Sequence, residues 1–139
     1  YRLSRFMCDW QAQGYRVSAM TYSETSRLYT VFATKICDDW RRFETIVFSV
    51  IGGGLQTRLC RWAAQGFIAT AIVGGTSEGY TVVMSRRAQG GIRHRPYEVA
   101  FNVLGEEQLS SSIEQMGLEG YFIPTAAVSS SGYVVLGFR

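Results

Sequence analysis

Most side chains in this sequence that could bind a ligand gather in two short segments. The basic and aromatic residues concerned are Trp40, Arg41, Arg42, Arg86, Arg87, Arg93, His94, Arg95 and Tyr97, and Phe43 follows directly after the first group. Arginine binds carboxylate and phosphate through two parallel hydrogen bonds, and it also stacks on aromatic rings. We therefore predict that the two segments meet on one edge as a basic, aromatic-lined groove for an anionic polymer, an acidic sugar or an acidic protein surface. The alternative is that these residues form a solvated rim.

Residues for catalysis or metal binding are scarce. His94 is the only histidine, and as a catalytic base it would need a nucleophile and an orienting carboxylate nearby. The sequence has no Gly-x-Ser-x-Gly motif, and Asp38 and Asp39 have no third metal ligand at a useful spacing. We expect no catalytic residue, no metal and no cofactor. An enzyme ranks third among the functions considered, and it would require His94, Asp38 or Asp39, and a Ser or Cys to meet in one pocket.

Three segments of the chain align on a glycine that an aromatic residue follows. These pairs are Gly14-Tyr15, Gly66-Phe67 and Gly120-Tyr121, with glycines 52 and 54 residues apart. Eleven, seven and four positions before each glycine stand large apolar residues, which are Leu3, Met7 and Trp10; Leu55, Leu59 and Trp62; and Leu109, Ile113 and Met116. This spacing places them on one face of a helix. We expect each helix to end at its glycine, which can take the left-handed conformation.

Strand-like runs surround each predicted helix. After each glycine come a β-rich run, a turn and a second run opening with Tyr29, Tyr80 or Tyr133, and a cation follows six residues later at Lys35, Arg86 or Arg139. The second and third copies also carry a strand before the helix, in which Ile46, Phe48 and Val50 match Val99, Phe101 and Val103. The unit is β-α-β-β, and the first copy lacks its leading strand. The sequence thus predicts eight strands and three helices.

These units predict an α+β fold in a single domain, residues 1–139. An incomplete first repeat covers 1–35, the second repeat 36–87 and the third 88–139. Because each helix must lay its apolar stripe on a sheet, we predict a curved, mostly antiparallel sheet or partial barrel with the three helices on one face. The opposite face includes Ile68, Thr70 and Ile72, and it would be an assembly interface if it were uncovered.

The three cysteines, Cys8, Cys37 and Cys60, do not form a disulfide framework, because their number is odd. With one histidine and no Cys-x-x-Cys pair, a zinc site is not expected either. We predict buried or half-buried thiols, with one disulfide plus a free thiol as the alternative. Cys8 and Cys60 hold the same repeat position, away from the apolar stripe, so we do not expect them to pair with each other.

The composition excludes several classes of protein. The 139 residues are 47% hydrophobic and 18% charged, which excludes a disordered tail. The formal net charge of +3 is too small to indicate nucleic acid as a partner. The uncharged stretch Tyr121–Phe138 is interrupted by Pro124 and a Ser-rich turn, so we expect a hairpin and no membrane span. The sequence opens without an apolar signal segment and inside the first repeat, as expected of a processed product or a fragment.

The repeated unit resembles a bacterial tandem-repeat family that is also found in the N-terminal region of fungal polyglycine hydrolases. The resemblance is carried by Trp10–Arg16 with Tyr29–Phe32, and by Trp62–Phe67. In that family the repeats often accompany a serine hydrolase domain similar to a β-lactamase, which needs Ser-x-x-Lys. The only lysine here, Lys35, has Phe32 three residues before it. The resemblance therefore implies an accessory module without the hydrolase, in a secreted or extracellular setting.

We predict a non-catalytic repeat module that binds a macromolecular or glycan partner, or that accompanies a larger secreted protein. The alternative is a structural subunit of a homo-oligomer or filament, assembled through the apolar sheet face or through the incomplete first repeat.

Overall fold

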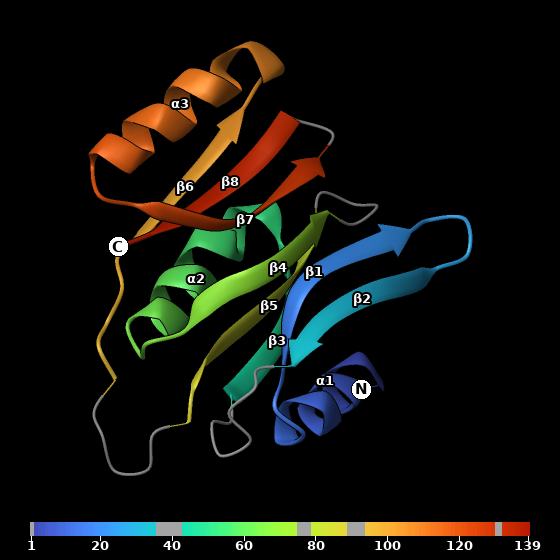
Figure 1. Ribbon diagram of the computed structural model, residues 1–139. Coiled ribbons are helices and arrows are strands. Elements are labelled where there is room, and N and C mark those ends of the chain that lie inside the picture. The colour runs from blue at the N-terminus through green and yellow to red at the C-terminus, as the bar shows by residue number, and fades with distance from the viewer. Residues whose placement is uncertain (1, 36–42, 75–78, 89–93, 130–131) are drawn as a thin grey trace.

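The computed structural model describes residues 2–35, 43–74, 79–88, 94–129 and 132–139. These residues form three α-helices and eight strands, as predicted (Figure 1). In chain order they are α1 (Arg2–Ala12), β1 (Tyr15–Ser23), β2 (Leu28–Lys35), β3 (Phe43–Ile51), a 3₁₀ turn (Gly52–Gly54), α2 (Leu55–Ala63), β4 (Ile68–Gly74), β5 (Gly79–Arg87), β6 (Val99–Leu104), α3 (Glu106–Leu118), β7 (Phe122–Ser129) and β8 (Gly132–Phe138). Among them, no helix combines the length and the apolar character needed to cross a membrane.

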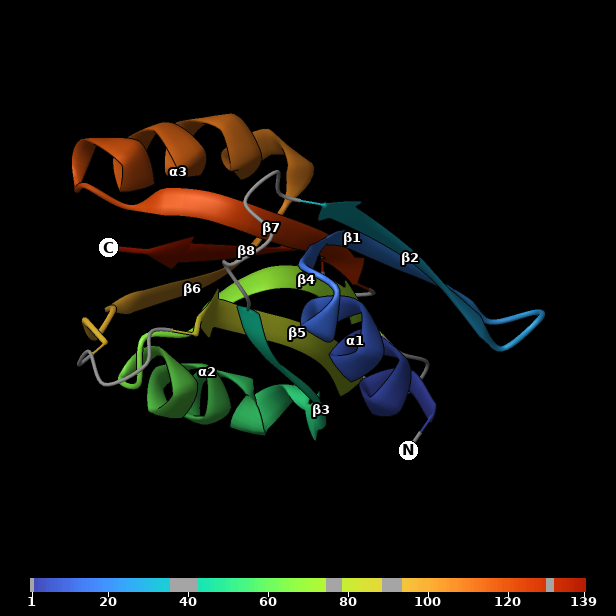
Figure 2. The same ribbon diagram turned by 60° about the horizontal axis from the view of Figure 1, so that its bottom comes forward.

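The described strands divide into three antiparallel sheets, ordered β1-β2, β3-β5-β4 and β6-β8-β7. The prediction of one continuous sheet is therefore wrong, and these strands do not close into a barrel. The sheets meet along β4, which contacts both β1 and β7. The helices do not share one face either, because α2 and α1 pack against opposite faces of the second sheet. Figure 2 shows α2 and α3 on opposite sides of the strands.

Three glycines end the helices in the predicted way. Gly14, Gly66 and Gly120 have φ angles of 86°, 90° and 89°, a left-handed conformation that other residues adopt only with strain. The backbone N–H of the next residue bonds back into the helix in two cases, from Phe67 to Trp62 at 3.2 Å and from Tyr121 to Met116 at 3.0 Å. Each glycine thus turns the chain from a helix directly into the following strand.

The buried side chains form two clusters of unequal size. The larger joins α2 to the second and third sheets, with Leu55, Leu59, Val82 and Leu136 fully buried. The smaller joins α1 and the β1-β2 hairpin to the other face of the second sheet. Its buried members are Met7, Val17, Met20, Ala71, Val73 and Val83. Hydroxyl groups accompany this contact, where Thr81 bonds to both Tyr29 (3.1 Å) and Ser49 (3.0 Å).

The strand ladders correct one part of the repeat alignment. Val50 of β3 lies opposite Tyr80, whereas Leu104 of β6 lies opposite Tyr133. Val50 is therefore equivalent to Leu104, and not to Val103 as the sequence alignment predicted. The consequence is that Phe101 packs on the larger cluster, while Asn102 points to Met116 of α3. The apolar pattern misled because both strands carry apolar residues on both faces.

Two further expectations are settled by burial. Thr70 and Ile72 are each 3% exposed, so this part of the supposedly free sheet face is covered within the chain. Cys8 and Cys60 are free thiols, as expected, but both are exposed, so the prediction of buried or half-buried thiols is wrong for them. They lie on the outer side of their helices, away from the apolar stripe. Cys37 lies outside the described residues.

Leu59 and Ile113 hold the same position in their helices but differ in burial, at 0% and 39% exposure. We predict that Leu59→Ala lowers the free energy of unfolding by about 2–5 kcal/mol, because it leaves a cavity in the larger cluster. Ile113→Ala is the matched control and should cost about 1 kcal/mol or less. Urea unfolding measures both. Equal losses would show that burial at this helix position does not set stability.

Candidate functional site

The described chain has a basic cavity of about 340 Å³ where β1, β5 and the segment before β6 come together. We call it the arginine pocket. It is lined by Arg16, Phe43, Gly66, Ile68, Ser85, Arg86, Arg87, His94, Arg95 and Tyr97. Four arginines and two aromatic rings thus surround one cavity, and no described carboxylate lines it.

The arginine pocket brings together the predicted site residues of the second segment. Arg86, Arg87, His94, Arg95 and Tyr97 all line it. The other predicted residues, Trp40, Arg41, Arg42 and Arg93, lie outside the described part of the chain. The structure therefore places five of the nine predicted residues around one cavity.

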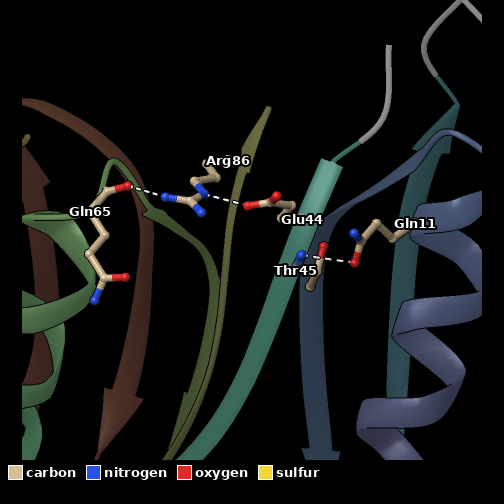
Figure 3. A network of polar contacts seen from close by, with 5 residues as sticks. All are labelled: Gln11, Glu44, Thr45, Gln65 and Arg86. Carbon is tan, nitrogen blue, oxygen red and sulfur yellow. Dashed lines mark hydrogen bonds and ion pairs between the residues drawn. The ribbon is translucent and has the colours of Figure 1, made fainter. Parts of the chain in front are cut away.

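Arg86 holds the pocket's framework together. Its Nε donates to Glu44 of β3 at 2.5 Å, and its NH1 donates to the backbone oxygen of Gln65 at the end of α2, as Figure 3 shows. Its guanidinium also lies 4.4 Å from the centre of the Phe67 ring. Arg86 lies on β5, the last strand of its unit, which we call the closing strand. It therefore links this strand to the leading strand β3 and to the end of α2. Its charge is already partly neutralised by Glu44. Beside it, Gln11 of α1 accepts a hydrogen bond from the Thr45 N–H at 2.8 Å.

Arg139 makes the same set of contacts in the third sheet. It donates to Glu98 at 2.9 Å and to the backbone oxygen of Glu119 at 2.7 Å. Its guanidinium lies 4.5 Å from the Tyr121 ring centre. The hydrogen bond to Glu98 is the main reason that the pKa of Arg139 is raised. In the second and third sheets, the cation six residues after the tyrosine thus has a structural role, because it links the closing strand to a glutamate near the leading strand and to the helix end.

The remaining guanidinium groups of the pocket are not balanced by any carboxylate of the described residues. Within the described residues, Arg16, Arg87 and Arg95 form no ion pair with a carboxylate. Arg16 is half-buried and lies 5.9 Å from the centre of the Phe43 ring. Burial lowers the pKa of Arg16, and the positive charge of Arg87 lowers it further. An anion bound between these side chains would relieve their repulsion.

Sequence reasoning missed Arg16 but included Phe43 among the aromatic residues interleaved with the cations. The available signal for Arg16 was its place directly after the Gly-aromatic pair, where the other two segments have Ile68 and Phe122. A charged residue at a position that is otherwise apolar is unusual enough to mark a site.

The pocket's side chains are suited to binding. Ser85 and His94 both line it, but Ser85 is 3% exposed and no described carboxylate is present to orient the histidine. Asp38 and Asp39, which the enzyme hypothesis requires, lie outside the described residues. Among the residues described, no cluster of three acidic, His or Cys side chains could hold a metal ion. Guanidinium groups beside aromatic rings can instead hold an anionic or planar group in place.

No family model matches the chain, and neither does any curated protein or solved structure.

Gly66 lets the segment before β6 approach the helix end closely. A Cβ atom at Gly66 would lie 2.6 Å from the Cβ of His94, whereas at Gly120 it would meet nothing within 4 Å. Because both glycines have the same positive φ, both alanine variants carry a similar backbone cost of roughly 1–2 kcal/mol. We predict that Gly66→Ala loses about 1 kcal/mol or more beyond Gly120→Ala, from the added clash. Urea unfolding tests this. Equal losses of stability in the two variants would mean that His94 moves away from the added Cβ at no cost in free energy.

Proposed function

We propose that this chain is a non-catalytic recognition module of three β-α-β-β units, the first without its leading strand, and that it binds an anionic group of a glycan or protein partner in the arginine pocket. The proposal depends most on one observation. Arg16, Arg87 and Arg95 come from different parts of the chain to one aromatic-walled cavity and have no described carboxylate partner there.

Recurring contacts support the three-unit interpretation. The second and third sheets have the same strand order. In each, the closing strand (β5 or β8) lies between the leading strand (β3 or β6) and the strand that follows the helix (β4 or β7). The first two helices each touch the leading strand of the next sheet, α1 with β3 and α2 with β6. The post-helix strands also touch in succession, β1 with β4 and β4 with β7. A tandem array requires this equivalence between neighbouring interfaces.

The electrostatics favour an anionic ligand. Clustered guanidinium groups without counter-charges cost stability, and proteins commonly keep such a cost where function needs it. The lowered pKa of Arg16 has this origin, since burial and Arg87 both disfavour its charged form. Carboxylate or sulfate groups on a sugar, or acidic side chains on a protein, would supply the missing charge. Nucleic acid is disfavoured by the small net charge of +3.

Assembly into a homo-oligomer through the sheet face has less support. That alternative needed an uncovered face at Ile68, Thr70 and Ile72, but Thr70 and Ile72 are buried. The resemblance to the tandem-repeat family fits the recognition proposal better, because it implies an accessory module of a larger secreted protein.

We predict that Arg87→Gln and Arg95→Gln each weaken binding of an oligomer of galacturonic acid by roughly tenfold in low salt, because each removes a charged hydrogen-bond donor. Isothermal titration calorimetry measures the affinity, and high salt should weaken binding by the native chain. Neutral galactose oligomers serve as the control ligand. Arg61→Gln is the control variant, because Arg61 is exposed on α2 and does not line the pocket. Equal affinities for all variants would refute the proposed site.

The same cluster makes an unusual stability prediction. Arg87→Gln should raise the free energy of unfolding in low salt by a few tenths of a kcal/mol to about 1 kcal/mol, because it relieves repulsion on Arg16. Arg61→Gln should not stabilise, since Arg61 lies in the last turn of α2, where a cation is favourable. Urea unfolding at low and high salt measures both. A loss of stability in Arg87→Gln would contradict the repulsion.

A further inference from the structure

In the described residues, β2 of the first sheet is paired on one side only, whereas its counterparts β5 and β8 are paired on both sides. β5 lies between β3 and β4, and β8 lies between β6 and β7. In the described residues, β2 is paired only with β1, so its other edge carries free backbone N–H and C=O groups. Such an edge can accept a further strand through main-chain hydrogen bonds.

Burial differs between the open and the completed sheets at matching positions. Leu55 of α2 and Val82 of β5 are 0% exposed, whereas the corresponding Leu3 and Val31 are only half-buried. Eight residues before its glycine, the first helix holds Phe6, which is 46% exposed. In the second unit this position is Arg58, whose guanidinium lies 5.2 Å from the ring centre of Phe48 on the leading strand. Phe6 therefore faces the space that a leading strand would occupy.

This space is a groove of about 820 Å³ between α1 and β2, which we call the strand groove. Its apolar lining includes Leu3, Phe6, Trp10, Leu28, Tyr29 and Val31. Its walls are thus the helix stripe on one side and the open strand on the other. In Figure 1, α1 lies beside the β1-β2 hairpin at the lower right.

The charge at one end of the strand groove is also incomplete. Arg86 and Arg139 each lie over an aromatic ring and each bind a glutamate near the start of the leading strand. These glutamates are Glu44, the second residue of β3, and Glu98, the residue before β6. Lys35 lies 5.8 Å from the centre of the Tyr15 ring in the same way. No carboxylate of the described residues pairs with it. A leading strand would bring that carboxylate.

We propose that the strand groove binds an extended segment of a partner polypeptide, which pairs antiparallel with β2. The segment carries an acidic residue opposite Lys35 and apolar side chains at alternate positions facing α1. β3 supplies the template, since Glu44, Ile46, Phe48 and Val50 lie opposite Arg86, Met84, Val82 and Tyr80. The corresponding residues of β2 are Lys35, Ala33, Val31 and Tyr29.

The site suits a single strand. Leu28 stands where the other units have Gly79 and Gly132. A Cβ at Gly132 would lie 2.5 Å from the Leu104 backbone oxygen, whereas a Cβ at Gly79 would make an ordinary contact, 3.5 Å from the Val50 backbone oxygen. The outer face of the β1-β2 hairpin is mostly polar, with exposed Ser18, Thr21, Thr30, Phe32 and Thr34. Because a further unit would have to pack on an apolar face, this surface is not suited to one.

A second copy of this chain is a poorer occupant. If two β2 edges paired with each other, no acidic residue would reach Lys35, because β2 reads Leu-Tyr-Thr-Val-Phe-Ala-Thr-Lys. The strands with the required pattern, β3 and β6, are already paired within the described fold. The groove therefore does not suit a second copy of this chain as its occupant.

A synthetic peptide with the sequence of residues 43–50 of this chain tests the assignment. Fluorescence anisotropy of the labelled peptide should show saturable binding, and hydrogen exchange should show new protection of β2 amides. Lys35→Glu should weaken binding at least fivefold. A peptide with Glu44→Lys should bind the native chain weakly and regain affinity for the Lys35→Glu chain. This reversal cannot arise from general stickiness or from displacement of β3.

Controls identify the groove as the binding place. Arg61→Glu is the matched charge reversal on an exposed helix position and should leave binding unchanged. A peptide with Phe48 and Ser49 exchanged keeps its composition but turns the aromatic ring away from α1, and it should bind weakly. Absence of saturable binding, or binding that ignores the charge reversal, would overturn the assignment. Concentration-dependent dimerisation that protects β2 without peptide would also overturn it, in favour of a second copy.

Discussion

Consecutive residues Val82, Val83 and Met84 of β5 are all fully buried, so both faces of the second sheet have to be covered. Successive side chains on a strand point to opposite faces. One face is therefore covered by α2 and the other by α1 with the first hairpin. The third sheet extends the first of these contacts, because Val134, Leu136 and Phe138 belong to the same cluster as α2. The splitting into three small sheets accompanies this packing, since α1 and α2 each contact both their own sheet and the leading strand of the next one.

Arginine has two separate roles in this arrangement, and the presence of a carboxylate distinguishes them. Arg86 and Arg139 bind a glutamate, an aromatic ring and a helix-end carbonyl, and so fix the strands around each helix. Arg16, Arg87 and Arg95 have no such acid among the described residues and surround a cavity. Arg86 binds Glu44 and Gln65, and it thereby fixes the strand on which the neighbouring pocket residue Arg87 lies.

The order of helices and strands could be predicted because local signals fix it. Apolar residues at helical spacing end at a glycine, and that glycine has positive φ in each case. The pairing of faces could not be predicted, because β6 carries apolar Val99, Phe101 and Val103 on one side and Leu104 on the other. The division into sheets depends on how α1 meets β3, a contact between distant residues. Five residues of the candidate site were found through their charge and clustering, whereas Arg16 comes from a strand more than sixty residues away in the chain.

The two clusters of buried side chains have a consequence for how the molecule opens. The larger contains α2 and two sheets, whereas the smaller holds α1 and the β1-β2 hairpin through fewer buried residues and a contact that includes hydroxyl groups. Regions with fewer buried apolar contacts open at lower free energy than the rest of a protein. The amino-terminal hairpin should thus behave as a separate foldon that detaches in subglobal openings while the remaining two sheets stay folded.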